Sequence, residues 1–166
     1  MESGKIYIVN GPNLNLTGRR QTTIYGNESM EQVVLRIQRA HPDLQLRYYQ
    51  SNHEGDLIDT LQAIGNETRK RYENETLRYE NENDSEKVLG IVLNAGGYSH
   101  TSIAIRDTVE WLREQGIPTI EVHISDISKR EAFRRTSLLT DVCQETYMGL
   151  GTLGYDKAVN TLLHVE

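Results

Sequence analysis

The chain of 166 residues contains one cysteine, three prolines and one tryptophan, and it has no apolar run long enough to cross a membrane. The single cysteine, Cys143, cannot form a disulfide within the chain. Residues 1–10 lack a basic stretch followed by an apolar core, so we expect no secretory signal. These absences predict a reduced, soluble, cytoplasmic protein with no membrane partner.

Positive charge is also scarce. Lys and Arg number 18 against 24 Asp and Glu, which gives a formal net charge of −6. A protein that binds nucleic acid in general needs a basic face, so we expect no nucleic-acid partner. The length suits one domain with its own core, and we treat residues 1–166 as that domain.

Several motifs of cofactor and hydrolase chemistry are missing. The sequence contains neither G-x-G-x-x-G nor G-x-x-x-x-G-K-[ST], and it lacks G-x-S-x-G. His100 and His123 could in principle bind zinc together with Glu121. Their spacing is not the compact H-E-x-x-H type, however, and nearby arginines would repel a metal. We therefore expect no metal site.

Short apolar segments alternate with amphipathic ones along the chain. Strands are expected at 5–9, 44–50, 88–93, 119–124 and 142–148, and helices at 29–40, from 54 onward, at 99–115, 129–136 and 153–163. Ser29 is a plausible N-cap, and Gly116 offers C-cap chemistry. The alternation predicts a flavodoxin-like three-layer α/β sandwich: a five-stranded parallel sheet of order 2-1-3-4-5 with helices on both faces.

One segment, residues 65–87, departs from this pattern. It holds seven acidic and five basic residues, and the pattern of Arg71–Glu75 recurs at Arg78–Glu82. Balanced charge of this kind is typical of a solvated face. We predict a polar insertion that extends the second helix and continues as a mobile loop without a catalytic role.

Two groups of polar residues follow predicted strands. Glu121 and His123 lie two apart on a strand, so their side chains share a face, and a carboxylate can orient an imidazole as a general acid. A buried pair that only satisfies its own hydrogen bonds would look the same. Tyr25, near Arg19 and Arg20, is a candidate base, because an arginine favours a neighbouring phenolate. The alternative is an aromatic side chain that packs within its loop.

Motifs along nearly the whole chain make a more specific pattern, apart from residues 65–87. In order they are Asn10-Gly-Pro-Asn-Leu-Asn-Leu16, Gly18-Arg-Arg20, Ile24-Tyr-Gly26, Ser51-Asn-His-Glu-Gly55, Leu93-Asn-Ala-Gly-Gly97, Ser99-His-Thr-Ser102, Glu121-Val-His-Ile-Ser125, Arg130-Glu131 and Phe133-Arg134. Together they resemble type II 3-dehydroquinate dehydratase of the shikimate pathway, which serves aromatic amino-acid biosynthesis. The resemblance implies a flavodoxin-like fold, no metal or organic cofactor, and assembly as a dodecamer built from trimers.

The resemblance also implies a reaction and its residues. Water would leave 3-dehydroquinate by anti elimination through an enolate, giving 3-dehydroshikimate. Tyr25 resembles the base, which Arg20 and Arg130 would keep ionised, and His123 resembles the general acid, oriented by Glu121. The remaining positions would stabilise the enolate (Asn13) or hold substrate (Asn94, Gly96, His100, Ile124, Ser125 and Arg134), and Asp107 resembles a residue that reaches a neighbouring subunit's site.

Two positions differ from the resembled pattern, which usually has Asn and His where this chain has Asp126 and Ser128. Asp126 either points to solvent or adds negative charge beside the expected carboxylate pocket. A different class, a non-enzymatic flavodoxin-like signalling or interaction domain, is the alternative. Phosphoacceptor domains carry acidic residues after the first and third strands, where this sequence has Asn10-Gly-Pro-Asn13 and Asn94-Ala-Gly-Gly97.

Overall fold

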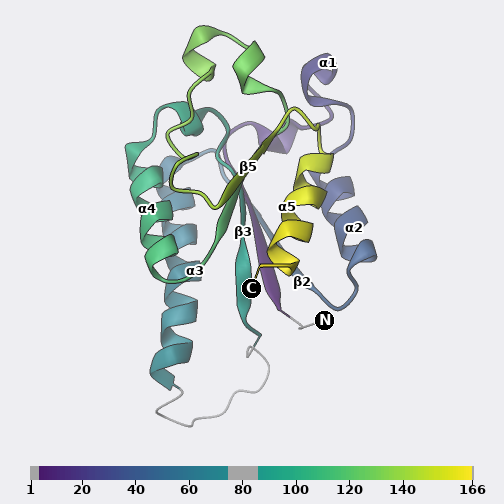
Figure 1. Ribbon diagram of the computed structural model, residues 1–166. Coiled ribbons are helices and arrows are strands. Elements are labelled where there is room, and N and C mark those ends of the chain that lie inside the picture. Colours follow the sequence, from purple (N-terminus) through teal and green to yellow (C-terminus); the bar gives the residue numbers. More distant parts are fainter. Residues whose placement is uncertain (1–3, 75–85, 166) are drawn as a thin grey trace.

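The computed structural model describes residues 4–74 and 86–165 of the chain. Its sheet consists of β1 (Lys5–Asn10), β2 (Gln45–Gln50), β3 (Val88–Asn94), β4 (Thr119–His123) and β5 (Glu145–Met148). Neighbouring strands are parallel and follow the order β2-β1-β3-β4-β5 (Figure 1). The predicted sheet and strand order are therefore confirmed.

Four longer helices cover the two faces of this sheet. Helices α2 (Met30–Ala40) and α5 (Leu153–Leu163) lie on one face, and α3 (Glu54–Asn74) and α4 (Ile103–Glu114) on the other (Figure 1). Two apolar cores result, because neighbouring strand residues point to opposite faces. Ile8 belongs to the core under α2 and α5, whereas Val9 belongs to the core under α3 and α4. The predicted three-layer α/β sandwich is confirmed.

Helix ends follow the predicted capping in part. Ser29 caps α2 through a capping box, since its side chain accepts from the Gln32 backbone and the Gln32 side chain accepts from the Ser29 backbone. Gly116 follows α4 with φ of 77°, as C-cap chemistry requires. The predicted start of that helix at residue 99 is wrong. Gly96–His100 forms a 3-10 turn instead, and Ser102 caps α4 by accepting from the Ile105 backbone at 2.9 Å.

The region between β4 and β5 also differs from prediction. Residues 129–136 form no α-helix but lie around two 3-10 turns, Ile127–Lys129 and Ala132–Arg134. Strand β5 begins only at Glu145, because the backbone amide of Cys143 bonds to the Leu139 carbonyl at 3.0 Å within a turn. Cys143 is thus not a strand residue. Its half-buried side chain packs against the core under α3 and α4, and burial raises the pKa of its thiol.

The polar segment is partly confirmed and partly corrected. Helix α3 continues to Asn74, as predicted, and residues 75–85, which contain most of the predicted mobile loop and the second charged repeat, lie outside the described residues. A solvated face is wrong for the start of the segment. Gly65 is buried, and Glu67 forms an ion pair with the buried Lys5 and accepts from the Tyr7 hydroxyl at 2.6 Å.

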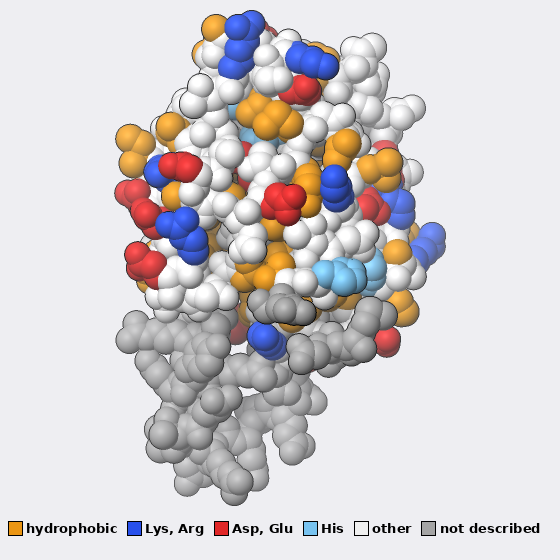
Figure 2. Space-filling view, viewed as in Figure 1, with side chains coloured by type: hydrophobic (Ala, Val, Ile, Leu, Met, Phe, Trp, Pro, Cys, Tyr) orange, Lys and Arg blue, Asp and Glu red, His pale blue; other side chains and the backbone are white. Residues whose placement is uncertain are grey.

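The carboxyl ends of the strands meet at one edge of the sheet, uppermost in Figure 1, where α1 and the loops after β3 and β4 gather. On the face shown in Figure 2, acidic and basic side chains are interspersed. Of the helices in the described ranges, none combines the length and apolar character that crossing a bilayer would take.

Candidate active site

A cavity of about 330 Å³ opens at the carboxyl edge of the sheet. Segments that follow β1, β3 and β4 line it, as expected for a parallel sheet whose strand order reverses between β1 and β3. It brings together most of the predicted site residues, namely Asn13, Arg20, Tyr25, Asn94, Gly96, His100, His123, Ile124, Ser125, Arg130 and Arg134. Residues from three separate loops therefore converge on one space large enough for a small ligand.

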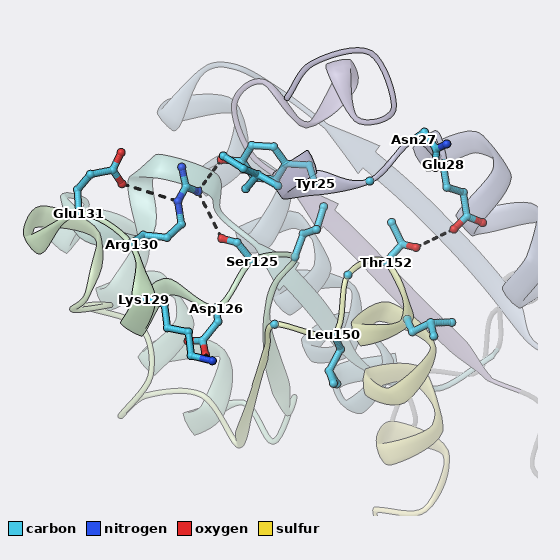
Figure 3. A pocket seen from close by; sticks show the side chains of 16 residues that line it. Tyr25, Asn27, Glu28, Ser125, Asp126, Lys129, Arg130, Glu131, Leu150 and Thr152 are labelled. Atoms are coloured by element: carbon cyan, nitrogen blue, oxygen red, sulfur yellow. Dashed lines mark hydrogen bonds and ion pairs between the residues drawn. The ribbon is translucent and has the colours of Figure 1, made fainter. Parts of the chain in front are cut away.

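Tyr25 ends a short helix, α1 (Thr22–Tyr25), that stands over this cavity. The phenol oxygen accepts a hydrogen bond from Nη1 of Arg130 at 2.7 Å (Figure 3), and the Arg20 guanidinium carbon lies 4.8 Å from the ring centroid. Arg130 also donates to Oγ of Ser125 at 3.3 Å. Two positively charged side chains thus lie against the phenol.

Glu121 lies behind the cavity, and its carboxylate faces His123. Its side chain is fully buried, with Oε1 3.2 Å from Nε2 of His123. Ser137 and Thr140 donate to its two oxygens at 2.7 and 2.8 Å. Burial raises the pKa of Glu121, but the adjacent His123 and the two hydroxyl hydrogen bonds lower it by more, so this pKa lies below its ordinary value. An ionised carboxylate therefore faces the imidazole.

A second imidazole lies beside the first. The rings of His100 and His123 are stacked, with centroids 6.2 Å apart and 22° between their planes. Nδ1 of His100 lies 2.8 Å from the carbonyl oxygen of Thr136. A carbonyl oxygen only accepts, so Nδ1 carries the hydrogen, and Nε2 of a neutral His100 is an acceptor. His100 can therefore accept a hydrogen bond from a ligand hydroxyl.

Asn13 holds an unusual backbone conformation at the cavity wall. Its φ of 68° is left-handed, and its backbone amide donates to Oδ1 of Asn52 at 3.0 Å. Gln50 donates to the same oxygen at 3.1 Å. Asn52 was given no role from the sequence. Its place in the Ser51–Gly55 motif was the available signal, but nothing in the sequence pairs it with Asn13, 39 residues away.

Glu131 is a further cavity residue that sequence reasoning missed. It accepts from Nε of Arg134 at 3.0 Å, and Nε of Arg130 lies 3.7 Å from the same carboxylate oxygen. One carboxylate thus restrains two of the arginines that line the cavity. Its signals in the sequence were its place in the Arg130-Glu131 motif and its spacing of three from Arg134, which suits an ion pair within one turn.

The two unusual positions in this chain pair with each other. The Asp126 carboxylate accepts from the backbone and the hydroxyl of Ser128, at 3.1 and 2.5 Å, and caps the turn Ile127–Lys129. The Ser128 hydroxyl, as the largest influence, lowers the pKa of Asp126. In Figure 3 the Asp126 side chain lies beside Lys129, apart from the Tyr25–Arg130 contact. The negatively charged Asp126 carboxylate is thus bound by hydrogen bonds within this turn.

Two predicted site residues do not line the cavity of this chain. Glu121 is buried behind His123, and Asp107 is exposed on α4. No three His, Cys, Asp or Glu side chains cluster as metal ligands anywhere in residues 4–67 and 86–165.

Comparisons with known proteins agree on one family. The family model "Dehydroquinase class II" matches residues 4–163. A 3-dehydroquinate dehydratase of an Exiguobacterium species is 40% identical over 160 residues, covering 96% of this chain and 94% of that protein. The enzyme of the same name from Campylobacter jejuni is 36% identical, covering 97% and 88%. The crystal structure of type II dehydroquinase from Butyrivibrio crossotus superposes with a TM-score of 0.75 at 37% identity, covering 97% of this chain and 98% of that one. These findings agree with the resemblance that the motifs at the strand ends indicated. The chain therefore belongs to the class II dehydroquinase family.

Proposed function

We infer that the protein removes water from 3-dehydroquinate in this cavity to give 3-dehydroshikimate, by anti elimination through an enolate. The curated relatives are named for the dehydration of 3-dehydroquinate. The observation that carries the residue assignment is the contact between Tyr25 and Arg130 at 2.7 Å, in a cavity that His123 also lines, with the Glu121 carboxylate behind the imidazole. Elimination beside a ketone needs a base and an acid, and these two groups supply them.

Tyr25 is the base in this proposal. Its phenolate takes the C2 proton, and the electron pair of that C–H bond forms the enolate, whose oxygen is the former ketone oxygen. Arg130 and Arg20 stabilise the phenolate by charge, because both guanidinium groups lie against the phenol. Asn13 stabilises the enolate oxygen through an ordered water.

His123 is the acid. When the enolate collapses, its electrons form the C1–C2 double bond and the C1 hydroxyl departs with a proton from the imidazolium, leaving as water. Glu121 supports this step because its ionised carboxylate, 3.2 Å from Nε2, stabilises the protonated ring and holds its orientation.

The rest of the cavity binds the substrate. Asn94, His100 and Arg134 hold its hydroxyls, and Gly96, Ile124 and Ser125 contribute backbone or hydroxyl donors, the last two at the carboxylate. Three arginines against one carboxylate, Glu131, make the lining positive although the whole chain is negative. This local charge suits an anionic substrate.

We further propose that the chain works in the cytoplasm as a homo-oligomer built on trimers, up to a dodecamer. Supporting this, Asp107 is exposed on α4 and is absent from the described residues that line its own cavity. In a cyclic assembly such a side chain can complete the pocket of the next subunit.

An ultraviolet assay for the conjugated enone product tests the function directly. Wild-type protein should convert 3-dehydroquinate, and Tyr25→Phe should lose at least about 1,000-fold in kcat while keeping its fold, because the base is gone and the ring remains. Tyr49→Phe, a half-exposed tyrosine on β2, is the matched control and should match wild type. Retention of most activity in Tyr25→Phe would remove Tyr25 from the mechanism.

A further inference from the structure

A fully buried phenol beneath the cavity joins two strand ends. Tyr155 on α5 donates its hydroxyl hydrogen to Oδ1 of Asn10 at 2.9 Å and accepts from Nδ2 of Asn94 at 3.0 Å. Asn10 and Asn94 are the last residues of β1 and β3 and are partners in the ladder between these strands. The hydroxyl therefore bridges the two strands at the point where the strand order reverses.

These bonds determine which way the Asn94 amide faces. Its Nδ2 bonds to Tyr155, and its Oδ1 accepts from the backbone amide of Gly96 at 3.1 Å. The hydroxyl of Tyr155 has one hydrogen, which Asn10 accepts, so toward Asn94 it can only accept. A flipped Asn94 would bring its oxygen against the Tyr155 oxygen and its NH₂ group against the Gly96 N–H. With both ends held, one hydrogen of Nδ2 is left for a ligand in the cavity.

Burial keeps this arrangement in one protonation state, because it raises the pKa of Tyr155 well above its ordinary value. The phenol thus remains a neutral donor and acceptor at any pH suitable for assay. Tyr155 is fully buried and is not among the described residues that line the cavity, so it makes no contact with a ligand there.

We propose that Tyr155 is a positioning residue: its hydroxyl orients the Asn94 amide so that Asn94 donates a hydrogen bond to a substrate hydroxyl. The proposal rests on the proposed function, in which Asn94 binds substrate. A hydroxyl that the elimination leaves unchanged is held about equally in the bound substrate and in the transition state. If Asn94, which binds this hydroxyl, loses its orientation, KM should therefore rise and kcat should stay unchanged.

Tyr155→Phe tests this role with the ring kept in place. We expect KM for 3-dehydroquinate to rise about tenfold with kcat within about twofold of wild type. Tyr147→Phe is the matched control, since it too removes a tyrosine hydroxyl that bonds to another side chain, here Oγ1 of Thr161 at 2.8 Å. Both variants should lower the melting temperature, but only Tyr155→Phe should change KM. An unchanged KM in folded Tyr155→Phe, or an equal rise in Tyr147→Phe, would overturn the proposal.

A double-mutant cycle separates positioning of Asn94 from an independent effect. Asn94→Ala should raise KM, and adding Tyr155→Phe to it should raise KM no further, because there is no amide left to orient. If Tyr155→Phe raised KM by the same factor in the wild-type and the Asn94→Ala proteins, Tyr155 would act without Asn94, which overturns the proposal. If Tyr155→Phe does not fold, 3-fluorotyrosine at position 155 keeps the hydroxyl but weakens it as an acceptor. It should raise KM by a smaller factor, and an unchanged KM would again contradict the proposal.

Failure of this proposal is distinguishable from failure of the proposed function. Wild-type protein that converts no 3-dehydroquinate would remove the function itself. Active wild type with a normal KM in Tyr155→Phe would remove only the positioning role.

Discussion

At the scale of single residues, the two proposed reacting groups of the cavity have neighbours of opposite charge. Arginines surround the Tyr25 phenol, whereas a buried carboxylate faces the His123 imidazole. The side chains against the phenol are thus positively charged, and the side chain that faces the imidazole is negatively charged. An elimination needs this pair of a base and an acid in one space.

The first prediction at this scale concerns the acid. His123→Ala should lower kcat by about 100-fold or more with a small change in KM, because protonation of the leaving hydroxyl belongs to the transition state. Steady-state kinetics on 3-dehydroquinate measure the split, and His164→Ala, an exposed histidine outside the cavity, serves as control. A change in KM alone would reassign His123 to substrate binding.

The second concerns Glu121, whose pKa in the folded chain lies below the ordinary 4.5. The unfolded chain takes up this proton at higher pH, so the stability that Glu121 contributes is complete above about pH 4.5 and is lost as the pH falls through the folded pKa. Glu121→Gln lacks this titration. Its free energy of unfolding should therefore fall less steeply than that of wild type between about pH 5 and pH 3.

Urea unfolding at a fixed protein concentration measures both pH profiles. The slopes are compared, and not the absolute stabilities, because removal of the charge also changes the contact with His123. Parallel profiles would show that Glu121 has the same pKa in the folded and unfolded chains.

At the scale of elements, the contact between α3 and α4 depends on a missing side chain. A Cβ atom built on Gly65 would lie 2.3 Å from Cζ3 of Trp111 and 3.1 Å from Cδ2 of Leu112. The two helices therefore pack closely at this position, at the start of the segment whose composition suggested a solvated surface. Gly55, ten residues earlier on α3, has no atom within 4 Å of such a Cβ.

This pair of glycines makes a controlled test. Gly65→Ala should lower the free energy of unfolding by about 1–3 kcal/mol, because the methyl group overpacks the contact with Trp111. Gly55→Ala should be neutral or stabilise by up to about 1 kcal/mol, since alanine lowers the entropy of the unfolded chain. Chemical denaturation of both variants decides the matter, and equal effects would contradict the close packing of α3 on α4.

At the scale of the whole molecule, one predicted substrate-binding residue lies outside the cavity of its own chain. Asp107 lies exposed on α4, while the other substrate-binding positions line the pocket of their own chain. An assembly in which one subunit's α4 meets the next subunit's cavity would bring it to a site. The proposed trimer-based oligomer would thus be needed for activity itself.

Mixing two inactive variants tests the shared site. Tyr25→Phe and Asp107→Asn should each be nearly inactive, but equal amounts unfolded and refolded together should recover activity in about one site in four, as random mixing around a ring gives. A site whose own subunit has Tyr25 and whose neighbour has Asp107 is complete. If Asp107 acts within its own chain, no site is complete. An absence of recovery in mixed oligomers confirmed by mass would therefore contradict the shared site.

The sequence by itself determined the architecture and the loops of the cavity. Strand and helix periodicity is local, so the five strands and the capping by Ser29 were predictable from neighbouring residues. The strand order followed from the alternation of strands and helices, because a five-stranded parallel α/β sheet commonly has the order 2-1-3-4-5. The motifs after β1, β3 and β4 had to converge, since parallel strands end at one edge. Turn details between β4 and β5 were not predictable, because the Asp126 cap and the Cys143 turn compete with helix and strand propensity.

Only the tertiary structure decided which distant polar groups meet. Glu67 reaches Lys5 across 62 positions, and Tyr155 reaches Asn10 across 145. Composition placed Glu67 on a solvated face and left Tyr155 without a role, because a polar side chain shows its partner only once the elements pack. Burial then makes such contacts compulsory, since an unpaired polar group costs about 1–3 kcal/mol in the interior. The sequence thus determined where the candidate site lies, and the packing of α3 and α5 on the sheet decided which distant polar groups pair.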